Sequence, residues 1–581
     1  MDTDSTKIGE VRKISGSTIN VSLDDDIAGA SPLYEGRLRQ VSQIGSFVKI
    51  PRGLLDILAV VSKVGVSDFS NEEEGYNWQP GEWNLQLQLL GQIDKGSEKF
   101  NRGVGSYPEI NDPVHFITAD TLRAVFPEPA GDKIKIGNLS NNRGVPVTID
   151  LKEIVVKHSA VFGSTGSGKT STVASLLQNI ERQGWKNSNI IVIDPHGEYS
   201  TALDGIASVL SVLPSEDENQ LEVPCWALPP DDILKVFFER GGPNQNFRSR
   251  FSELVVNQRR NLVDDADWLS YMDQSSVNPD TPIPFDIRQV WHSLSYENRE
   301  TIDEHGDSCV TNEGGAEELN PPAFEDYGQG GQPPNKGDNF NSYGTSPEYL
   351  RRALEDPRFQ FFQRPRTDIQ NQDPLESVIQ EWLGNENPIS VLDFSGVPES
   401  AAQAAVGIIL KFLFEISTRA RNPDEGIGRQ DPVLVIVEEA HRFVGNDARI
   451  ETKDAVNRIA KEGRKYGIGL MVVTQRPSEV PSTTLSQCGT LISLRLSSQG
   501  DQATVTSALP ETTLGISESL SSLRKLEAII SGEAIKLPSR VFVDEPDPFP
   551  EADDPPIETW KMSPEKPSLA GVLRDWRGTY N

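Results

Sequence analysis

The chain has 581 residues, which is too long for a single hydrophobic core and predicts roughly two or three domains. No apolar run reaches the length of a membrane span and the acidic, polar start carries no secretory signal, so we expect neither a membrane protein nor a secreted one. The net charge of −31 does not exclude nucleic acid, because net charge governs solubility and steering while a local basic lining can still bind phosphates.

Residues 1–125 have the pattern of short β-strands. Segments such as KIGEVRKISGSTINVSL (7–23) and LQLQLLGQI (85–93) alternate apolar and polar residues around glycine and serine turns. Short strands at regular spacing predict a small barrel. No catalytic cluster occurs in this range, so we interpret the domain as a scaffold or docking module.

Residues 126–545 have a different pattern, in which strands that are apolar throughout alternate with amphipathic helices. The apolar strands are SAVF (159–162), IIVID (190–194), ISVLD (389–393), VLVIV (433–437) and IGLMVVT (468–474). Such strands are typical of a parallel sheet that is covered by helices on both faces. This range therefore predicts an α/β core.

Residues 228–385 interrupt this core and predict a helical and partly disordered insertion. FRSRFSELVVNQRRNL (247–262) has helical spacing with a basic face. Residues 301–345 are rich in Gly, Pro, Asn and acids, which predicts a mobile loop. The C-terminal linker and tail, 546–581, is rich in Pro and Asp at first, and SLAGVLRDW (568–576) predicts a short docking helix.

Residues 163–170, GSTGSGKT, match the phosphate-binding pattern G-x-x-x-x-G-K-[ST] between a strand and a helix. Its glycines let backbone N–H groups face an anion, and the helix N-terminus adds its dipole. We predict that Lys169 reaches the β- and γ-phosphates and that the Thr170 hydroxyl binds Mg²⁺. The predicted nucleotide-binding residues are Gly163, Ser164, Thr165, Gly166, Ser167, Gly168, Lys169, Thr170 and Ser171. No L-S-G-G-Q transporter signature accompanies the loop, and we expect ATP with Mg²⁺.

The strand VLVIV ends on two adjacent carboxylates, Glu438 and Glu439. ATP hydrolases need one carboxylate for the hydrated metal and another to polarise the attacking water. We predict that Glu438 serves Mg²⁺ and that Glu439 serves the water. A solvated strand end and an acid pair favoured by a helix dipole are the alternatives that the sequence leaves open.

Two further residues complete a motor-like site. Gln475 follows the apolar strand IGLMVVT and is predicted to lie beside the γ-phosphate and sense its loss; an ordinary polar strand end is the alternative. Arg464 lies near the end of a predicted helix, where a cation complements the helix dipole. Its functional interpretation is an arginine finger that reaches the ATP of a neighbouring subunit, which requires a ring.

Several of these segments together resemble one known family. GSTGSGKT, IIVIDPHGEY (190–199), VIVEEAHRF (435–443), IAKEGRKYGIGLMVVTQRPSEV (459–480) and LISLRL (491–496), in this order, closely resemble HerA, of the FtsK–HerA superfamily of hexameric DNA-pumping ATPases. FNRGVGSYPEINDPV (100–114) resembles the small barrel domain of that family. The resemblance implies a RecA-like P-loop NTPase core over 126–545, an N-terminal barrel like the HAS-barrel over 1–125, and a helical insertion over 228–385.

The resemblance also implies roles for single residues. The implied catalytic residues are Lys169, Glu439, Arg464 and Gln475, and the implied metal-binding residues are Thr170 and Glu438. The acid pair is Glu-Glu where many relatives have Asp-Glu. Lys157-His158 stands where the family often has Arg-His, so a basic contact from Lys157 to its own nucleotide is not expected. Asp194, His196 and Glu198 match the DPHGEY motif, and both strand-end packing and chemistry remain open for them.

The resemblance implies a homohexamer that hydrolyses ATP and moves double-stranded DNA through a central pore as a translocase or helicase. It also implies a partner docked on the barrel. This partner is either a NurA-like nuclease in DNA end processing, or a sirtuin-like NAD hydrolase or nuclease in anti-phage defence. The alternatives are a conjugation- or secretion-type DNA-pumping ATPase and an ATP-binding ring scaffold for an effector enzyme. The three cysteines are far apart and form no metal pattern, so we expect a cytoplasmic protein with no membrane partner.

Overall fold

The fold is described from a computed structural model of the chain. It describes residues 6–25, 27, 33–34, 37–38, 43–66, 83–97, 99–214, 219–238, 242–328, 332–362, 368–420, 427–510, 514–551, 561 and 568–576. The chain forms two compact units. Unit 1 comprises Met1–Ser208, Glu386–Val391 and Leu410–Glu551, and unit 2 comprises Val209–Asn385, Leu392–Ile409 and Ala552–Asn581.

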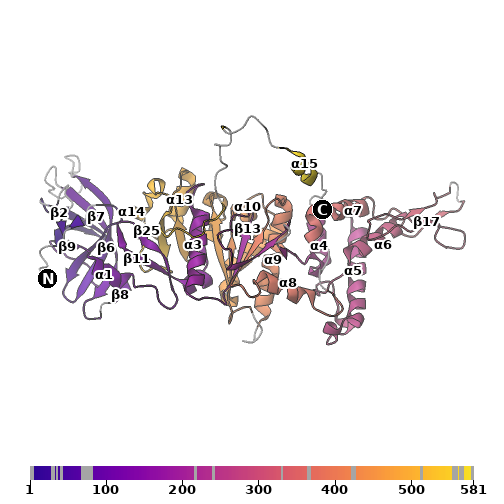
Figure 1. The fold of residues 1–581 in the computed structure, drawn as a ribbon, viewed down its shortest axis with the longest axis horizontal. Helices are drawn as coiled ribbons and strands as arrows, with labels where there is room; N and C mark the ends of the chain where they lie inside the picture. Colours follow the sequence, from indigo (N-terminus) through magenta and orange to yellow (C-terminus); the bar gives the residue numbers. More distant parts are fainter. Residues whose placement is uncertain are drawn as a thin grey trace. The chain divides into compact units, whose positions relative to one another are not determined.

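The N-terminal strands of unit 1 close into a barrel (Figure 1). Its strands are β1 (Lys7–Ser15), β2 (Thr18–Leu23), β5 (Phe47–Arg52), β6 (Leu55–Val66), β7 (Trp83–Asp94) and β9 (Pro113–Phe116). Within the described ranges their order is β2-β1-β9-β5-β6-β7, and pairing of β2 with β7 closes the ring. A short strand, β8 (Phe100–Arg102), extends the sheet beyond β7, and β3 (Leu33–Tyr34) pairs separately with β4 (Arg37–Leu38). The predicted barrel is confirmed.

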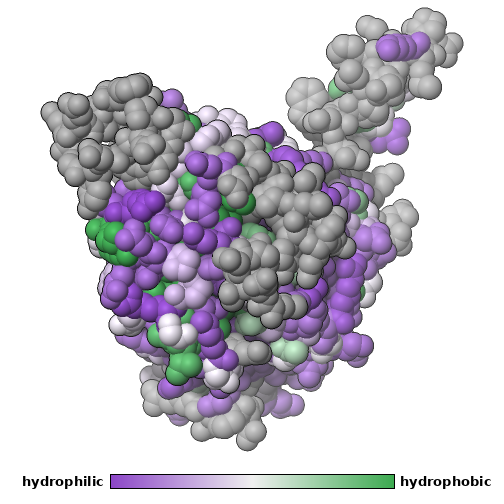
Figure 2. Space-filling view, turned by 90° about the vertical axis from the view of Figure 1, so that its left-hand side faces the viewer, coloured by the Kyte–Doolittle hydropathy of each residue, from purple (hydrophilic) through white to green (hydrophobic). Residues whose placement is uncertain are grey.

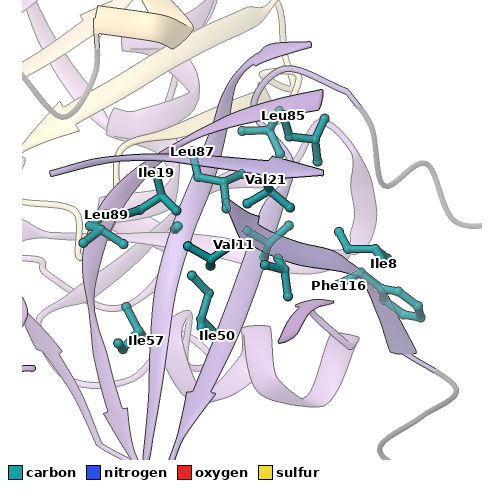
Figure 3. Packing of buried hydrophobic residues seen from close by; sticks show 14 of the residues in the cluster. Ile8, Val11, Ile19, Val21, Ile50, Ile57, Leu85, Leu87, Leu89 and Phe116 are labelled. Carbon is teal, nitrogen blue, oxygen red and sulfur yellow. The ribbon is translucent and has the colours of Figure 1, made fainter. Parts of the chain in front are cut away.

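Alternating side chains fill the interior of this barrel. Leu85, Leu87 and Leu89 of β7 are buried, whereas the intervening Gln86 and Gln88 are half-buried. A strand places successive side chains on opposite faces, so the leucines share the inner face. Figure 3 shows them gathered with aliphatic and aromatic side chains from β1, β2, β5, β6 and β9 in one cluster. The barrel interior is therefore a packed apolar core, as expected of a scaffold.

A second sheet forms the centre of unit 1. Its strands are β10 (Lys133–Leu139), β11 (Asn142–Asp150), β12 (Ser159–Phe162), β13 (Asn189–Asp194), β20 (Ile389–Asp393), β21 (Val433–Val437), β22 (Ile468–Thr474), β23 (Thr490–Ser493), β24 (Glu527–Gly532) and β25 (Ser539–Val543). The order along the sheet is β11-β10-β25-β24-β23-β12-β22-β21-β13-β20. The pairs from β23 to β13 are parallel, as predicted.

The pairs from β11 to β23 are antiparallel, which the sequence analysis did not predict. For the pairs β10–β11 and β24–β25 the physical reason is the length of the connections. Only short segments join β10 to β11 and β24 to β25. A short connection can form a hairpin but cannot cross over a sheet, as a parallel pair requires.

Helices cover the central sheet. The helices of unit 1 are α1 (Ala119–Val125), α2 (Leu151–Val156), α3 (Lys169–Arg182), α10 (His441–Val444), α11 (Ile450–Tyr466), α12 (Ser482–Leu485), α13 (Gln499–Ala508) and α14 (Leu514–Ser517). Helices α2 and α11 pack against β22, and α3 packs against β10. Helix α11 ends at Gly467 with φ = 78°, where an added Cβ would lie 2.0 Å from the Gly428 backbone oxygen. This glycine therefore fixes the point at which the chain leaves α11 and enters β22.

Unit 2 includes residues 228–385, the range predicted as a helical insertion. Its helices are α4 (Pro230–Phe237), α5 (Gln245–Asp265), α6 (Ile287–Arg299), α7 (Ser346–Glu355) and α8 (Pro374–Trp382), and β14 (Ala207–Ser211) pairs with β15 (Asn219–Gln220). Arg259 of α5 is fully buried and donates hydrogen bonds to backbone oxygens of Trp226, Leu228, Pro279 and Ile283. Burial lowers the pKa of Arg259 to about 10, and the four acceptors stabilise the cation in place of water.

Residues 301–345, predicted as a mobile loop, form two short antiparallel ribbons in their described parts. The ribbons pair β16 (Thr301–Ile302) with β19 (Asn335–Lys336) and β17 (Val310–Asn312) with β18 (Ala323–Phe324). Figure 1 shows β17 in an arm that extends beyond α6. Turn chemistry and aromatic contact hold this arm where aliphatic residues are scarce: Asp303 Oδ1 accepts the N–H groups of His305 and Asp307, and the Tyr296 and Phe324 ring centroids lie 4.9 Å apart.

Helix α9 (Glu399–Arg419) is long and apolar enough to cross a membrane by length and composition alone. The expectation that no apolar run reaches this length was therefore too strict. Of the window that meets the test, 78% is buried inside the protein, which favours a core helix. Helix α15 (Ala570–Trp576) forms where the sequence predicted a short helix, with Leu569 and Val572 exposed.

Candidate nucleotide site

The phosphate-binding loop connects β12 to α3 and is held by the strands on either side of β12. Gly163 N donates a hydrogen bond to the Thr474 backbone oxygen at the end of β22 (3.3 Å). Ser164 N donates to the Arg495 backbone oxygen just beyond β23 (2.8 Å). Because β12, β22 and β23 are parallel, the loop lies at the carboxyl edge of the sheet. This edge is where open α/β sheets bind ligands.

Glycine is required in this loop at positions where the backbone is left-handed. Gly166 has φ = 72° and Gly168 has φ = 100°. A Cβ on Gly168 would also lie 2.8 Å from Leu526 Cδ2, so both conformation and space select glycine there. Helix α3 begins at the next residue, Lys169, and the first helical turn therefore places Lys169 and Thr170 at the mouth of the loop.

The two strand-end carboxylates lie in different environments. Glu438 is only 5% exposed, and its Oε1 accepts a hydrogen bond from the Tyr199 hydroxyl. Burial raises the pKa of Glu438 to about 8, although Tyr199 and the charge of Lys169 oppose the rise. At neutral pH this carboxyl group is therefore mainly protonated in the structure as it stands.

Glu439 is ionised. Burial alone would raise its pKa, but the hydrogen bond with His441 and the charge of Lys169 outweigh burial, and the pKa is lowered. His441 Nδ1 lies 3.1 Å from Glu439 Oε2. Glu439 also has φ = 46°, a conformation that costs a non-glycine residue energy and is held only where its surroundings impose it. The pair therefore supplies one neutral and one ionised carboxyl group, which suits two separate roles.

Gln475 lies beside the loop. Its Oε1 accepts a hydrogen bond from the Thr165 hydroxyl at 2.7 Å. The preceding residue, Thr474, is linked to the acid pair, because its Oγ1 lies 3.2 Å from His441 Nδ1. His441 therefore connects Glu439 to the end of β22, a role that the sequence did not reveal because the two strands lie far apart in the chain.

The DPHGEY segment supplies residues whose position the sequence analysis could not explain. Asp194 ends β13, which pairs with β21. Its Oδ1 accepts the N–H groups of His196 and Gly197 at 3.0 Å each, and its Oδ2 accepts that of Tyr199 at 3.1 Å. The turn that results brings Glu198 to Thr170, whose hydroxyl donates to Glu198 Oε2 at 2.7 Å. The one available sequence signal was the match of Asp194, His196 and Glu198 to the DPHGEY motif.

Arg464 lies at the opposite edge of the sheet. It is exposed near the end of α11, and within the part of the chain that the structure describes it forms no ion pair. Its charge acts on His158, immediately before β12, and on Glu533, whose pKa is lowered mainly by the hydrogen bond from Lys157. Lys157 forms ion pairs with both Glu153 and Glu533.

The structure thus brings together all the predicted site residues except Arg464. At the carboxyl edge of the sheet lie Gly163, Ser164, Thr165, Gly166, Ser167, Gly168, Lys169, Thr170, Ser171, Glu438, Glu439 and Gln475. Their catalytic and metal-binding roles remain predictions.

His158 gives a prediction about stability and pH. It is buried with φ = 53°, its Nδ1 accepts the Leu470 N–H at 3.0 Å, and burial lowers its pKa from 6.5 to about 4. The folded state therefore prefers the neutral ring, and this stabilisation is complete above pH 6.5 and lost as the pH falls toward 4. Between these limits we expect the free energy of unfolding to fall by about 3 kcal/mol through this residue.

Chemical unfolding at pH 7 and at pH 5 measures this effect. His158→Asn, which tolerates the left-handed backbone, should show a smaller loss of stability on acidification than the wild type. Equal losses in the two proteins would show that His158 is not the responsible group.

The comparisons with known proteins agree with this geometry. The family described as "Helicase HerA, central domain" matches residues 134–413, and "Helicase HerA-like C-terminal" matches residues 382–538. The chain belongs to the HerA family. As a member of this family it is a nucleotide-binding P-loop enzyme, an ATP hydrolase of the helicase class.

Its relatives match over most of their length. "Probable helicase MJ1565" of Methanocaldococcus jannaschii is 25% identical over 87% of this chain and 87% of its own length. "DNA double-strand break repair helicase HerA" of Sulfolobus acidocaldarius is 27% identical over 81% of this chain and 80% of its own. Among solved structures, VirB4 of Thermoanaerobacter pseudethanolicus aligns with 74% of this chain and 99% of its own, at 15% identity and a TM-score of 0.45.

Proposed function

We propose that this HerA-family chain is the subunit of a homohexameric ring that hydrolyses ATP and moves along double-stranded DNA. The observation that carries the proposal is the meeting of Lys169, ionised Glu439 and Gln475 at one sheet edge, with Arg464 at the other. The relatives named as DNA double-strand break repair helicases support DNA as the substrate. The parallel strand order β23-β12-β22-β21-β13 supports a RecA-like core.

The donor set fits ATP with Mg²⁺. The loop offers backbone N–H groups at a helix start and Lys169 supplies a cation for the phosphates. Thr170 supplies the hydroxyl that such sites use for the metal, and Glu438 supplies an acid from the neighbouring strand end. When bound, Mg²⁺ would neutralise charge on the phosphate oxygens.

The residues of the chain itself perform the remaining tasks. Glu439 is ionised and can accept a proton from, or orient, the attacking water. His441 Nδ1 lies 3.1 Å from that carboxylate. Gln475 already contacts the loop through Thr165, so a change at the γ-phosphate position would reach the end of β22 through this hydrogen bond.

The position of Arg464 supports the proposed ring. The phosphate-binding loop of the same chain begins at the opposite, carboxyl end of β12. This four-residue strand spans about 13 Å at roughly 3.3 Å per residue. An exposed arginine on that edge is placed to enter the nucleotide site of a neighbouring copy. In hexameric symmetry one contact of this kind would repeat around the ring.

The barrel is the proposed docking domain for a nuclease or other effector enzyme. Figure 2, seen from the side on which the barrel lies, shows a mainly hydrophilic surface with separate hydrophobic spots. Leu54, Tyr107 and Ile110 are at least half exposed on the barrel. Arg52 pairs with Glu109, which brings the turn carrying Leu54 next to the segment carrying Ile110. The three cysteines are free, and a cytoplasmic location is part of the proposal.

The test measures ATP turnover, oligomeric state and DNA movement in one preparation. We expect a hexamer by mass, ATP turnover that rises on addition of linear duplex DNA, and a stimulation that weakens steeply with salt because the contacts are to phosphates. A monomer, or turnover indifferent to DNA, would contradict the proposal. Nucleotide binding without turnover would favour the ring scaffold instead.

A further inference from the structure

The Thr170 hydroxyl has a carboxylate partner that the sequence does not assign. The Thr170 hydroxyl donates a hydrogen bond to Glu198 Oε2 at 2.7 Å. A hydroxyl has one proton and two acceptor lone pairs. When the Glu198 carboxylate accepts this hydrogen bond, the lone pairs of the Thr170 hydroxyl oxygen point away from Glu198. They are then available to a cation on the other side.

The position of Glu198 is built into the backbone. Both carboxylate oxygens of Asp194, which is 1% exposed, accept backbone N–H groups on either side of residue 198. The Glu551 N–H donates a hydrogen bond to the Glu198 backbone oxygen at 3.0 Å, so a second segment of the chain also holds this turn. These contacts hold the backbone of residue 198 in place, so that its side chain starts from a fixed position near Thr170.

Glu438 does not make this contact. Its Oε1 instead accepts a hydrogen bond from the Tyr199 hydroxyl. The adjacent residues Glu198 and Tyr199 thus reach two different partners, the threonine of the loop and the acid of β21. In this arrangement the carboxylate partner of Thr170 comes from the turn after β13, not from the end of β21.

We propose that Glu198 is a positioning residue of the metal site, which orients the Thr170 hydroxyl oxygen toward Mg²⁺. The inference rests on the proposed binding of ATP with Mg²⁺. Residues that hydrogen-bond to metal ligands fix the orientation of those ligands, and their removal typically weakens metal affinity by about 10–100-fold. The effect acts on the metal requirement and leaves the backbone contacts of the loop to the phosphates unchanged.

The experiment is a Mg²⁺ titration of nucleotide binding, which needs no turnover. A fluorescent non-hydrolysable ATP analogue is bound to the full-length protein with increasing Mg²⁺, and separately in EDTA. Glu198→Ala is expected to raise the half-saturating Mg²⁺ concentration by about 10-fold or more, with binding in EDTA within about threefold of wild type. Glu198→Gln should fall between, because its amide oxygen still accepts the hydroxyl proton but carries no charge.

Two further variants sharpen the result. Glu551→Gln removes an exposed carboxylate from the segment fastened to the same turn and should leave the titration unchanged. Thr170→Ala and Glu198→Ala together should raise the Mg²⁺ requirement little more than Thr170→Ala alone, because coupled residues are not additive.

Other outcomes would overturn the inference. An unchanged Mg²⁺ requirement in Glu198→Ala overturns the inference about Glu198 and leaves the proposed function standing. An equal loss of nucleotide binding with Mg²⁺ and in EDTA does the same, because it indicates a structural role for Glu198. A wild-type protein that binds no nucleotide overturns the inference together with the proposed function.

Discussion

Replacing Glu439 by glutamine is expected to lower ATP turnover by about 10²–10⁴-fold, the usual contribution of a general base, while nucleotide binding is retained. Glutamine has the same shape and can occupy the left-handed position that Glu439 holds at φ = 46°. What it lacks is the negative charge that His441 and Lys169 stabilise against the effect of burial. Steady-state hydrolysis and the dissociation constant for a non-hydrolysable ATP analogue measure the two properties separately.

Lys169→Ala is the informative comparison for this variant. Lys169 interacts electrostatically with both acids and begins α3 at the loop, so its loss should weaken nucleotide binding as well as turnover. Glu479→Gln is the matched control, since it removes an exposed acid near the same sheet edge that pairs only with Arg476 among the described residues. If Glu439→Gln keeps turnover within about threefold of wild type, the water-polarising role assigned to Glu439 is wrong.

Local patterns were sufficient to predict much of the fold. The alternation of leucine and glutamine at 85–89 identified a barrel strand, and the apolar runs that end at Val437 and Thr474 identified the parallel centre of the sheet. Local patterns could not predict the ribbons between residues 301 and 345. Few aliphatic residues hold them, and they depend on turns and ring contacts whose partners are not adjacent in sequence.

The same division applies to the site. Lys169 and Thr170 follow from a continuous motif in which spacing alone defines the chemistry. Glu198 and Tyr199 could not be assigned, because their partners Thr170 and Glu438 become visible only when β13 pairs with β21 across more than two hundred residues of sequence. Strand order in a parallel sheet depends on long crossover connections, and a single sequence contains no direct record of it.

Mixing two inactive variants is expected to restore ATP turnover if Arg464 acts across a subunit interface. Arg464→Ala alone should lower turnover by about 10³-fold or more, as for other arginine fingers. In a ring assembled with Glu439→Gln subunits, some sites combine an intact Glu439 with an intact Arg464 from the neighbour. With random mixing at equal amounts this is about one quarter of the interfaces in a cyclic ring, so turnover should rise well above that of either variant.

The competing explanation for Arg464 is the helix dipole, and a neighbouring residue separates the two. Lys465 is also exposed at the same end of α11, ahead of Gly467. A cation there stabilises the helix end by about 0.3–1 kcal/mol at most surface sites, which is too little for a thousandfold loss of turnover. Lys465→Ala should therefore remain close to wild type, and its mixture with Glu439→Gln should add no recovery beyond its own activity. Equal losses for Lys465→Ala and Arg464→Ala, or no recovery in mixed rings that are intact by mass, would show that Arg464 only stabilises the helix end.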